Sequence, residues 1–153
     1  MTQPRSIKGR ALSLLSVREH TRAELEKKLK RHEVEPGSLT EALDQLQRKG
    51  LISHQRVIES VLHQRAPKWG SLKIEYALKN KGLEPDAITE ALLTLKSTEQ
   101  ARALAVWQQK YKQKSSSPQE EIKQIRFMVG RGFTTEIIHK VLKSRGQDLE
   151  DGQ

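Results

Sequence analysis

The chain has 153 residues, no cysteine and a formal charge of +9, with 28 Lys and Arg against 19 Asp and Glu. The missing cysteine excludes disulfides, thiolate metal sites and a cysteine nucleophile, and 4% aromatic residues are too few for the core of a β-sandwich or barrel. The longest stretches without a charged residue are seven residues, far below the roughly 20 needed to span a bilayer. No apolar segment typical of a signal peptide follows the N-terminus, so we expect a cytoplasmic protein that does not bind membranes.

Apolar residues recur at spacings of three and four along the chain, as in helices that are buried on one face. This period predicts an all-α fold of nine helices, each of about 10 to 16 residues. In chain order the apolar stripes are Ala11, Leu14, Leu15; Leu25, Leu29; Leu39, Leu43, Leu46; Val57, Val61, Leu62; Ile74, Leu78; Ile88, Leu92, Leu95; Leu104, Trp107; Ile122, Ile125, Met128; and Ile137, Ile138, Val141, Leu142.

Helix starts and stops are predicted between these stripes. Three segments have the spacing of a capping box, namely Thr21–Glu24, Ser38–Glu41 (at the start of its helix or just inside it) and Ser117–Glu120. Prolines suit first helical turns at Pro36, Pro85 and Pro118. Glycines follow basic helix ends, where a left-handed residue is expected, at Gly50, Gly82, Gly132 and Gly146.

An internal repeat organises the helices. A shift of 49 residues places Leu25 on Ile74 and Val34 on Leu83, and it aligns the identical segments Thr40–Leu43 and Thr89–Leu92. A fainter third copy places Gly132 on Gly82 at a shift of 50. Because one such copy buries little area alone, we expect three stacked three-helix repeats in an elongated, curved α-repeat that offers a long binding surface. The predicted boundaries are an N-terminal tail 1–5, repeats 6–49, 50–96 and 97–145, and a C-terminal tail 146–153.

The sequence contains no catalytic motif: there is no nucleophile elbow, no Walker-type loop and no His-Glu-x-x-His. The five histidines lack metal-ligand spacing within any one helix. His20 is interpreted as a loop or packing residue, and His139, between apolar neighbours, as partly buried. We therefore expect no enzymatic activity, no metal and no cofactor.

The remaining functional signal is positive charge, which is strongest in the last third: residues 97–149 carry +5, against +3 for residues 6–49 and +2 for residues 50–96. For each basic cluster the alternative is a solvated helix face. Trp69 either stacks on a partner or covers a seam between repeats, and for both Trp69 and Trp107 packing is the favoured interpretation. The candidate partner contacts are Lys27, Lys28, Arg31, Lys68, Trp69, Lys73, Lys110, Lys112, Lys114, Lys123, Arg126 and Arg131.

Four segments together resemble a known family. Arg18–Leu29 (REHTRAELEKKL) resembles the opening signature of the RecX family of recombination regulators, and Leu46–Ile52, with Arg56, resembles its entry to the second repeat. The closing motif of the family is similar to Arg126–Phe133, with Ile138, Val141 and Leu142. The second-repeat run is matched by Arg65, Lys68–Gly70, Ile74, Leu78 and Lys81–Leu83, although Trp69-Gly70 stands where Gly-Tyr-Gly is usual, and Ser53-His54 and Val57 replace an acidic pair and Phe.

The resemblance implies a non-enzymatic, monomeric modulator of the RecA recombinase that lies in the groove of the RecA–DNA filament. Such proteins suppress ATP hydrolysis, strand exchange and co-protease activity, or promote filament shortening. The candidate contacts would then face the filament, with weak binding to single- or double-stranded DNA as an addition. The alternatives are an independent sequence-nonspecific DNA-binding module and a scaffold for another acidic protein.

Overall fold

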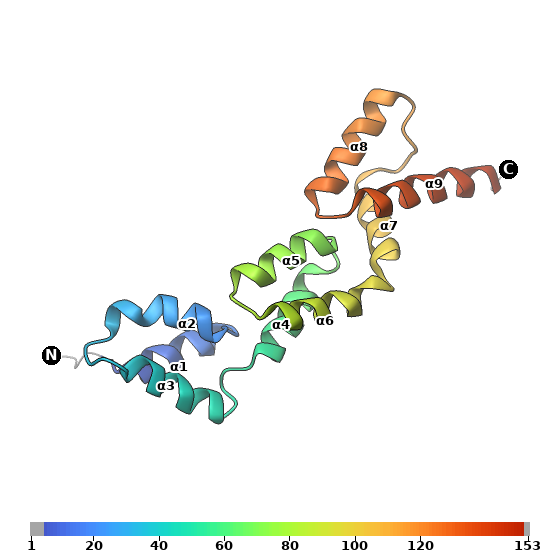
Figure 1. Cartoon of the computed structure of the whole chain (residues 1–153). Helices are drawn as coiled ribbons and strands as arrows, with labels where there is room; N and C mark the ends of the chain where they lie inside the picture. Colours follow the sequence, from blue (N-terminus) through green and yellow to red (C-terminus); the bar gives the residue numbers. More distant parts are fainter. Residues whose placement is uncertain (1–4, 152–153) are drawn as a thin grey trace. The chain divides into compact units, whose positions relative to one another are not determined.

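The computed structural model describes residues 5–151, with side chains described up to residue 144. Over this range the chain forms nine α-helices and one short 3-10 turn, without a strand (Figure 1), so the predicted all-α class and helix number are confirmed. The elements are α1 (Ile7–Val17), α2 (Arg22–Leu29), η1 (Lys30–His32), α3 (Ser38–Arg48), α4 (His54–Arg65), α5 (Ser71–Asn80), α6 (Pro85–Lys96), α7 (Glu99–Lys110), α8 (Pro118–Gly130) and α9 (Thr135–Asp151).

The helix ends agree with the sequence in part. Pro85 and Pro118 occupy first helical positions, as predicted, whereas Pro36 lies in the turn before α3. Helix α9 continues through Gly146 to Asp151, so the expectation that this glycine ends the helix is wrong. Glycine costs only about 1 kcal/mol in a helix interior, which does not prevent helix formation. Residues 1–4 and 152–153 of the two expected tails lie outside the described residues.

The three predicted capping boxes have different outcomes. Thr21 forms the complete box, because its hydroxyl accepts the Glu24 N–H at 3.1 Å and the Glu24 carboxylate accepts the Thr21 N–H at 3.1 Å. Ser117 caps α8 through the Glu120 N–H at 3.2 Å, but the Glu120 carboxylate turns to Ser116 instead. Ser38 forms no box, because Gly37 takes the cap position and leaves Ser38 as the first residue of α3.

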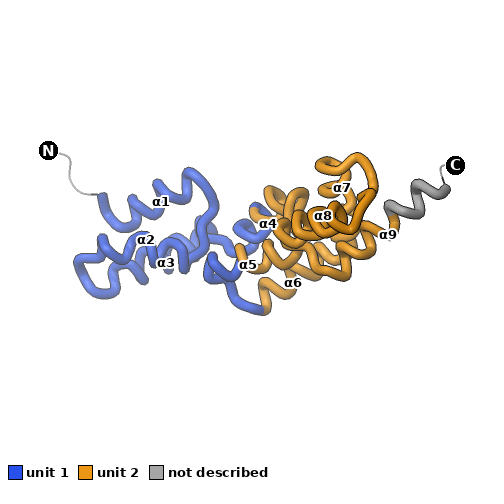
Figure 2. Tube along the Cα trace, turned by 90° about the horizontal axis from the view of Figure 1, so that it is seen from above, with its two compact units in different colours: residues 1–60, 78–85 blue, residues 61–77, 86–153 orange. Residues whose placement is uncertain are grey.

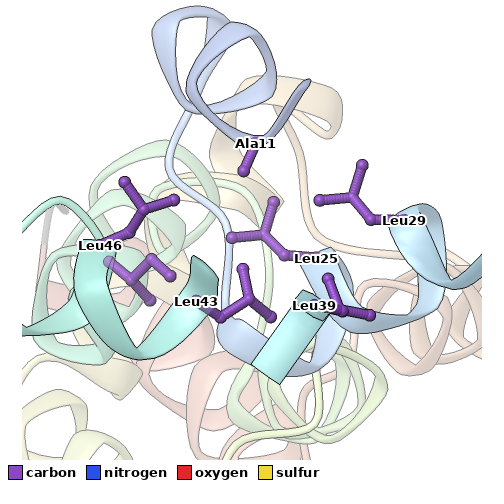
Figure 3. Close-up of a cluster of buried hydrophobic side chains, with 7 residues drawn as sticks. Ala11, Leu25, Leu29, Leu39, Leu43 and Leu46 are labelled. Carbon is purple, nitrogen blue, oxygen red and sulfur yellow. The ribbon is translucent and has the colours of Figure 1, made fainter. Parts of the chain in front are cut away.

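The core of the first repeat lies among α1, α2 and α3 (Figure 3). The helical period predicted the buried Ala11, Leu25, Leu29, Leu39, Leu43 and Leu46 on the inner faces of these helices. Ile52, from the link between α3 and α4, joins them without having been predicted by that period. The equivalence of Val34 and Leu83 does not extend to burial. Val34 is 91% exposed after η1, whereas Leu83 is 6% exposed after the left-handed Gly82.

The third repeat has a core of its own, centred on Trp107. The Trp107 side chain is fully buried, and its indole N–H donates to the Gln124 side-chain oxygen at 3.1 Å. Trp107 is therefore a core residue, as the favoured interpretation held. It packs with Ala103, Val106, Met128, Phe133, Ile138 and Val141.

The chain divides into two compact units (Figure 2). Unit 1 contains residues 1–60 and 78–85, and unit 2 contains residues 61–77 and 86–153. Each unit therefore combines segments of successive repeats, with parts of α4 and α5 in both.

Within unit 1, the start of α2 packs on the turn between α5 and α6. We call this the first repeat contact, formed by Thr21, Ala23, Lys81 and Gly82. The Thr21 hydroxyl donates to the Lys81 carbonyl. Gly82 has φ 75°, and a Cβ at this position would lie 2.5 Å from the Ala23 Cβ. Only glycine fits here, both for its backbone angle and for the space.

Within unit 2, the equivalent segments also meet, here through backbone hydrogen bonds. We call this the second repeat contact, formed by Gly70, Leu72, Lys73, Arg131 and Gly132. The Gly70 N–H donates to the Arg131 carbonyl at 2.7 Å, and the Leu72 N–H donates to the Gly132 carbonyl at 3.0 Å. Gly132 has φ 93°, and a Cβ there would overlap the Lys73 side chain and backbone. The sequence repeat therefore also appears in the packing. In both contacts the start of the second helix of one repeat, α2 or α5, lies on the glycine turn of the following repeat.

Candidate partner-binding surface

In unit 2 the loop that carries Trp69 is held by two charged residues of α7, the partly buried Arg102 and the buried Glu99. Arg102 donates to the Ala66 carbonyl at 2.7 Å and to the Trp69 carbonyl at 2.9 Å. Burial lowers the pKa of Arg102, while the charge of Glu99 acts to raise it. Glu99, only 7% exposed, accepts the N–H of Ser71, the first residue of α5, at 2.9 Å. These bonds fix both ends of the short Trp69 loop.

Trp69 is half-buried and lies between cations of the two flanking helices, α4 and α5. The Arg65 guanidinium and the Lys73 ammonium are each 4.6 Å from the centre of the indole. Contacts of this kind contribute about 0.5–1 kcal/mol at exposed sites. Trp69 is therefore not a core residue: its ring holds two positive charges at the surface.

A second aromatic ring repeats this arrangement. The Lys110 ammonium lies 4.2 Å from the centre of the Phe127 ring, and the Arg131 guanidinium lies 5.1 Å from it. The ring of Tyr111 meets Phe127 edge-on at 5.6 Å. Because the Arg131 carbonyl also accepts the Gly70 N–H, the second repeat contact joins the two clusters of cations and rings.

A hollow of about 310 Å³ opens beside Phe127, with Pro67, Lys68 and Val106 on its walls. None of the cations around it, nor Arg65 and Lys73, belongs to an ion pair found among the described residues. A local excess of positive charge results, which attracts anionic groups. We call this set the basic–aromatic surface; it contains Arg65, Lys68, Trp69, Lys73, Lys110, Phe127 and Arg131.

The basic–aromatic surface gathers five of the candidate contacts: Lys68, Trp69, Lys73, Lys110 and Arg131. Arg65 and Phe127 were not among the candidates. The spacing of four between Arg65, Trp69 and Lys73 could have indicated the first. Nothing in the local sequence indicates that Phe127 meets Lys110, because the loop between α7 and α8 sets that contact.

A second hollow, of about 510 Å³, shares Lys110 with the basic–aromatic surface and is also lined by three other candidates of the third repeat, Lys112, Lys114 and Lys123. Its carboxylate, Glu120, accepts hydrogen bonds from the Ser116 N–H and hydroxyl, which lower its pKa. It therefore stays ionised and offsets one of the four charges. Arg126 is exposed on α8.

The candidates of the first repeat lie in unit 1. Lys27, Lys28 and Arg31 are exposed on α2 and η1, and they line a hollow of about 740 Å³. Eleven of the twelve candidates therefore belong to three basic clusters, one in unit 1 and two in unit 2, and Arg126 belongs to none of them.

The histidines behave differently from one another. His20 is 2% exposed, and its Nδ1 lies 3.0 Å from the Arg18 carbonyl, so it is a packing residue as interpreted. Burial lowers its pKa, and the charges of Arg18 and Lys28 add to this effect. His139 is exposed on α9, so the expectation of partial burial is wrong: Ile138 and Val141 take the inner face of that turn. Among the described residues, no three His, Asp or Glu side chains gather as metal ligands do.

These observations define a class: an α-helical repeat protein, built from three tandem three-helix domains, with basic surfaces. No helix in the described part of the chain is long and apolar enough to cross a membrane. Family models for the first, second and third three-helix domains of RecX match residues 8–46, 53–92 and 97–142. The chain therefore belongs to the RecX family.

Relatives and solved structures agree with this assignment. "Regulatory protein RecX" of Leptothrix cholodnii is 40% identical over 90% of this chain and 88% of that protein. The protein of the same name from Ralstonia nicotianae is 39% identical over 98% of this chain and 94% of that protein. The crystal structure of RecX from Lactobacillus salivarius has the same fold, with a TM-score of 0.76 at 22% identity over 92% of this chain and 95% of that one.

Proposed function

We propose that this protein modulates the RecA recombinase by binding along the RecA–DNA filament, where it acts mainly as an inhibitor of ATP hydrolysis, strand exchange and co-protease activity. One observation carries the proposal: in a chain of a family named for regulation, five predicted contacts gather on one basic–aromatic surface without carboxylate partners. A filament presents acidic side chains and phosphates at regular intervals, and tandem repeats suit a target that itself repeats.

The state of the aromatic rings favours a filament over naked single-stranded DNA. Proteins that bind single strands use open aromatic faces on which bases stack. Here Trp69 and Phe127 are each covered by two cations at 4.2–5.1 Å. A base would have to displace these cations, so the surface suits contacts by charge better than by stacking.

The second candidate is sequence-nonspecific DNA binding by the protein alone, which the unpaired cations also favour. Reading of base edges has little support, because α3 and α6 carry acidic residues, among them Glu41, Asp44 and Glu90, where a recognition helix needs donors.

Affinity for two targets separates these candidates. Fluorescence anisotropy of the labelled protein would be measured with RecA filaments on single-stranded DNA and with the same DNA alone, at near-physiological salt. We expect binding to the filament to be stronger by about tenfold or more, because protein contacts add to those with phosphates. Equal or stronger binding to naked DNA would favour the second candidate.

A further inference from the structure

The hollow of about 740 Å³ in unit 1 has a strongly basic lining. One side comes from α1 and the residue that precedes its cap, with Arg10 and Arg5, and the other side comes from α2 and η1. The Arg5 guanidinium reaches into the hollow and donates to the Ser13 hydroxyl at 3.0 Å. The remaining basic groups of the lining are Lys27, Lys28, Arg31 and His32.

The carboxylate in this lining does not neutralise these charges. Glu24 already accepts hydrogen bonds from Arg18 at 2.8 Å and from the Thr21 N–H, and it pairs with Lys81 at 3.5 Å. Arg5, Arg10, Lys27 and Arg31 form none of the ion pairs found among the described residues. The hollow therefore holds an excess of fixed positive charge that only an added anion would offset.

The pKa of His32 responds to this excess of positive charge. The Arg31 Nε donates to its Nε2 at 3.2 Å, so the ring is held as an acceptor. Burial lowers the pKa of His32, and the charges of Arg10 and Arg31 lower it further. A histidine ring that contacts one guanidinium group and feels the charge of a second is expected to stay neutral, because its surroundings are already too positive for another cation.

The chemistry of the lining selects the anion. Guanidinium groups bind phosphate oxygens in bidentate fashion, and lysines add point charges. Three arginines and two lysines around one hollow match several linked negative charges better than a lone carboxylate. We propose that this hollow is a binding site for linked phosphate groups, supplied by a nucleic-acid backbone or by a free polyphosphate or nucleotide. The first source rests on the proposed function and deepens it, and the second source does not depend on it.

Titration with inorganic tripolyphosphate tests the site. We expect calorimetric binding and a rise in the pKa of His32, followed by NMR of its ring protons, which are assigned by their loss in His32→Gln. The double variant Arg10→Gln/Arg31→Gln should lose at least about tenfold in affinity for tripolyphosphate, because it loses two charge-assisted contacts. The matched control Arg48→Gln/Lys49→Gln removes the same charge from exposed residues at the end of α3 and should bind like the wild type.

Competition identifies the source. Displacement of tripolyphosphate from His32 by an oligothymidylate indicates a nucleic-acid backbone, and bound tripolyphosphate that resists the oligonucleotide indicates a free polyphosphate. Absence of binding to the wild-type protein, or equal binding by Arg10→Gln/Arg31→Gln and the control, would overturn the proposal. The affinity of the wild-type protein for the RecA filament is measured separately. Filament binding without tripolyphosphate binding would overturn the phosphate site and leave the proposed function in place.

Discussion

Glu24 connects the start of α2 to a residue 57 positions later. Its carboxylate completes the capping box with Thr21 and also pairs with Arg18 and Lys81, with its side chain only 13% exposed. Burial opposes ionisation of Glu24, but the hydrogen bonds from Arg18 and the Thr21 N–H, with the charge of Lys81, lower its pKa to about 2. The negative charge of Glu24 is therefore a stabilising part of the first repeat contact.

This pKa predicts how stability depends on pH. A carboxyl group with a lowered pKa stabilises the fold above its ordinary pKa of 4.5, and this contribution is lost as the pH falls from 4.5 through about 2. We expect Glu24→Gln to lower the free energy of unfolding by about 2–3 kcal/mol at pH 7 and by much less at pH 2. Urea unfolding followed by circular dichroism at both pH values measures the difference.

Glu26→Gln is the matched control, because Glu26 forms an exposed i,i+4 pair with Arg22 at 3.1 Å. Its loss should cost no more than about 0.5 kcal/mol at either pH. A Glu24→Gln effect that is equally small, or independent of pH, would contradict this role.

At this scale the sequence predicts local partners only. The spacing from Thr21 to Glu24 indicated the capping box, because both residues lie within one helical turn. The pairing of Glu24 with Lys81 depends on the packing of the next repeat, which no local spacing encodes.

The two repeat contacts share one arrangement of helix and turn. Each places the start of a second helix on a left-handed glycine turn, with Gly82 against Ala23 in unit 1 and Gly132 against Lys73 in unit 2. Gly50 has nearly the same backbone angle as Gly82, φ 77° against 75°, but no atom lies within 4 Å of a Cβ built there. Substitutions at Gly50 and Gly82 therefore separate the cost of backbone strain from the cost of steric overlap with Ala23.

We expect Gly50→Ala to cost about 1–2 kcal/mol, the left-handed backbone penalty alone. Gly82→Ala should cost roughly 1–3 kcal/mol more, because its methyl group overlaps Ala23. Ala23→Gly should restore part of that difference, which a double-mutant cycle on urea unfolding measures. Equal costs for the two alanine substitutions, or no coupling to Ala23, would show that the first repeat contact does not constrain Gly82.

The sequence predicted these glycines as helix ends and the repeats that contain them, because both signals are local or periodic. Their partners could not be predicted: Ala23 and Gly82 are 59 residues apart, and a helical period does not show which turn a helix meets. The same limit applies to Ser38, where Gly37 took the cap position that the capping-box spacing assigned to the serine.

For the whole molecule, the fold was predictable and the candidate site was predictable in part. Charge and placement selected Lys68, Trp69, Lys73, Lys110 and Arg131, which the basic–aromatic surface brings together. The pairing of Lys110 with Phe127 and the inclusion of Arg5 and Arg10 in the unit 1 hollow arise from tertiary packing. Charge alone indicated an acidic partner, and family membership is what directs the proposal to RecA.

The DNA-dependent ATPase of a cognate RecA filament tests this account most directly. Substoichiometric wild-type protein should lower the rate at near-physiological salt. The variant with Lys110, Lys112 and Lys114 each changed to Glu should inhibit much less at unchanged helix content, because it reverses one charge of the basic–aromatic surface and two charges of the neighbouring hollow. The control with Lys30, Arg48 and Lys49 each changed to Glu alters the same number of exposed charges and should inhibit like the wild type. Full ATPase activity at equimolar wild-type protein, together with tight binding to naked DNA, would contradict the account.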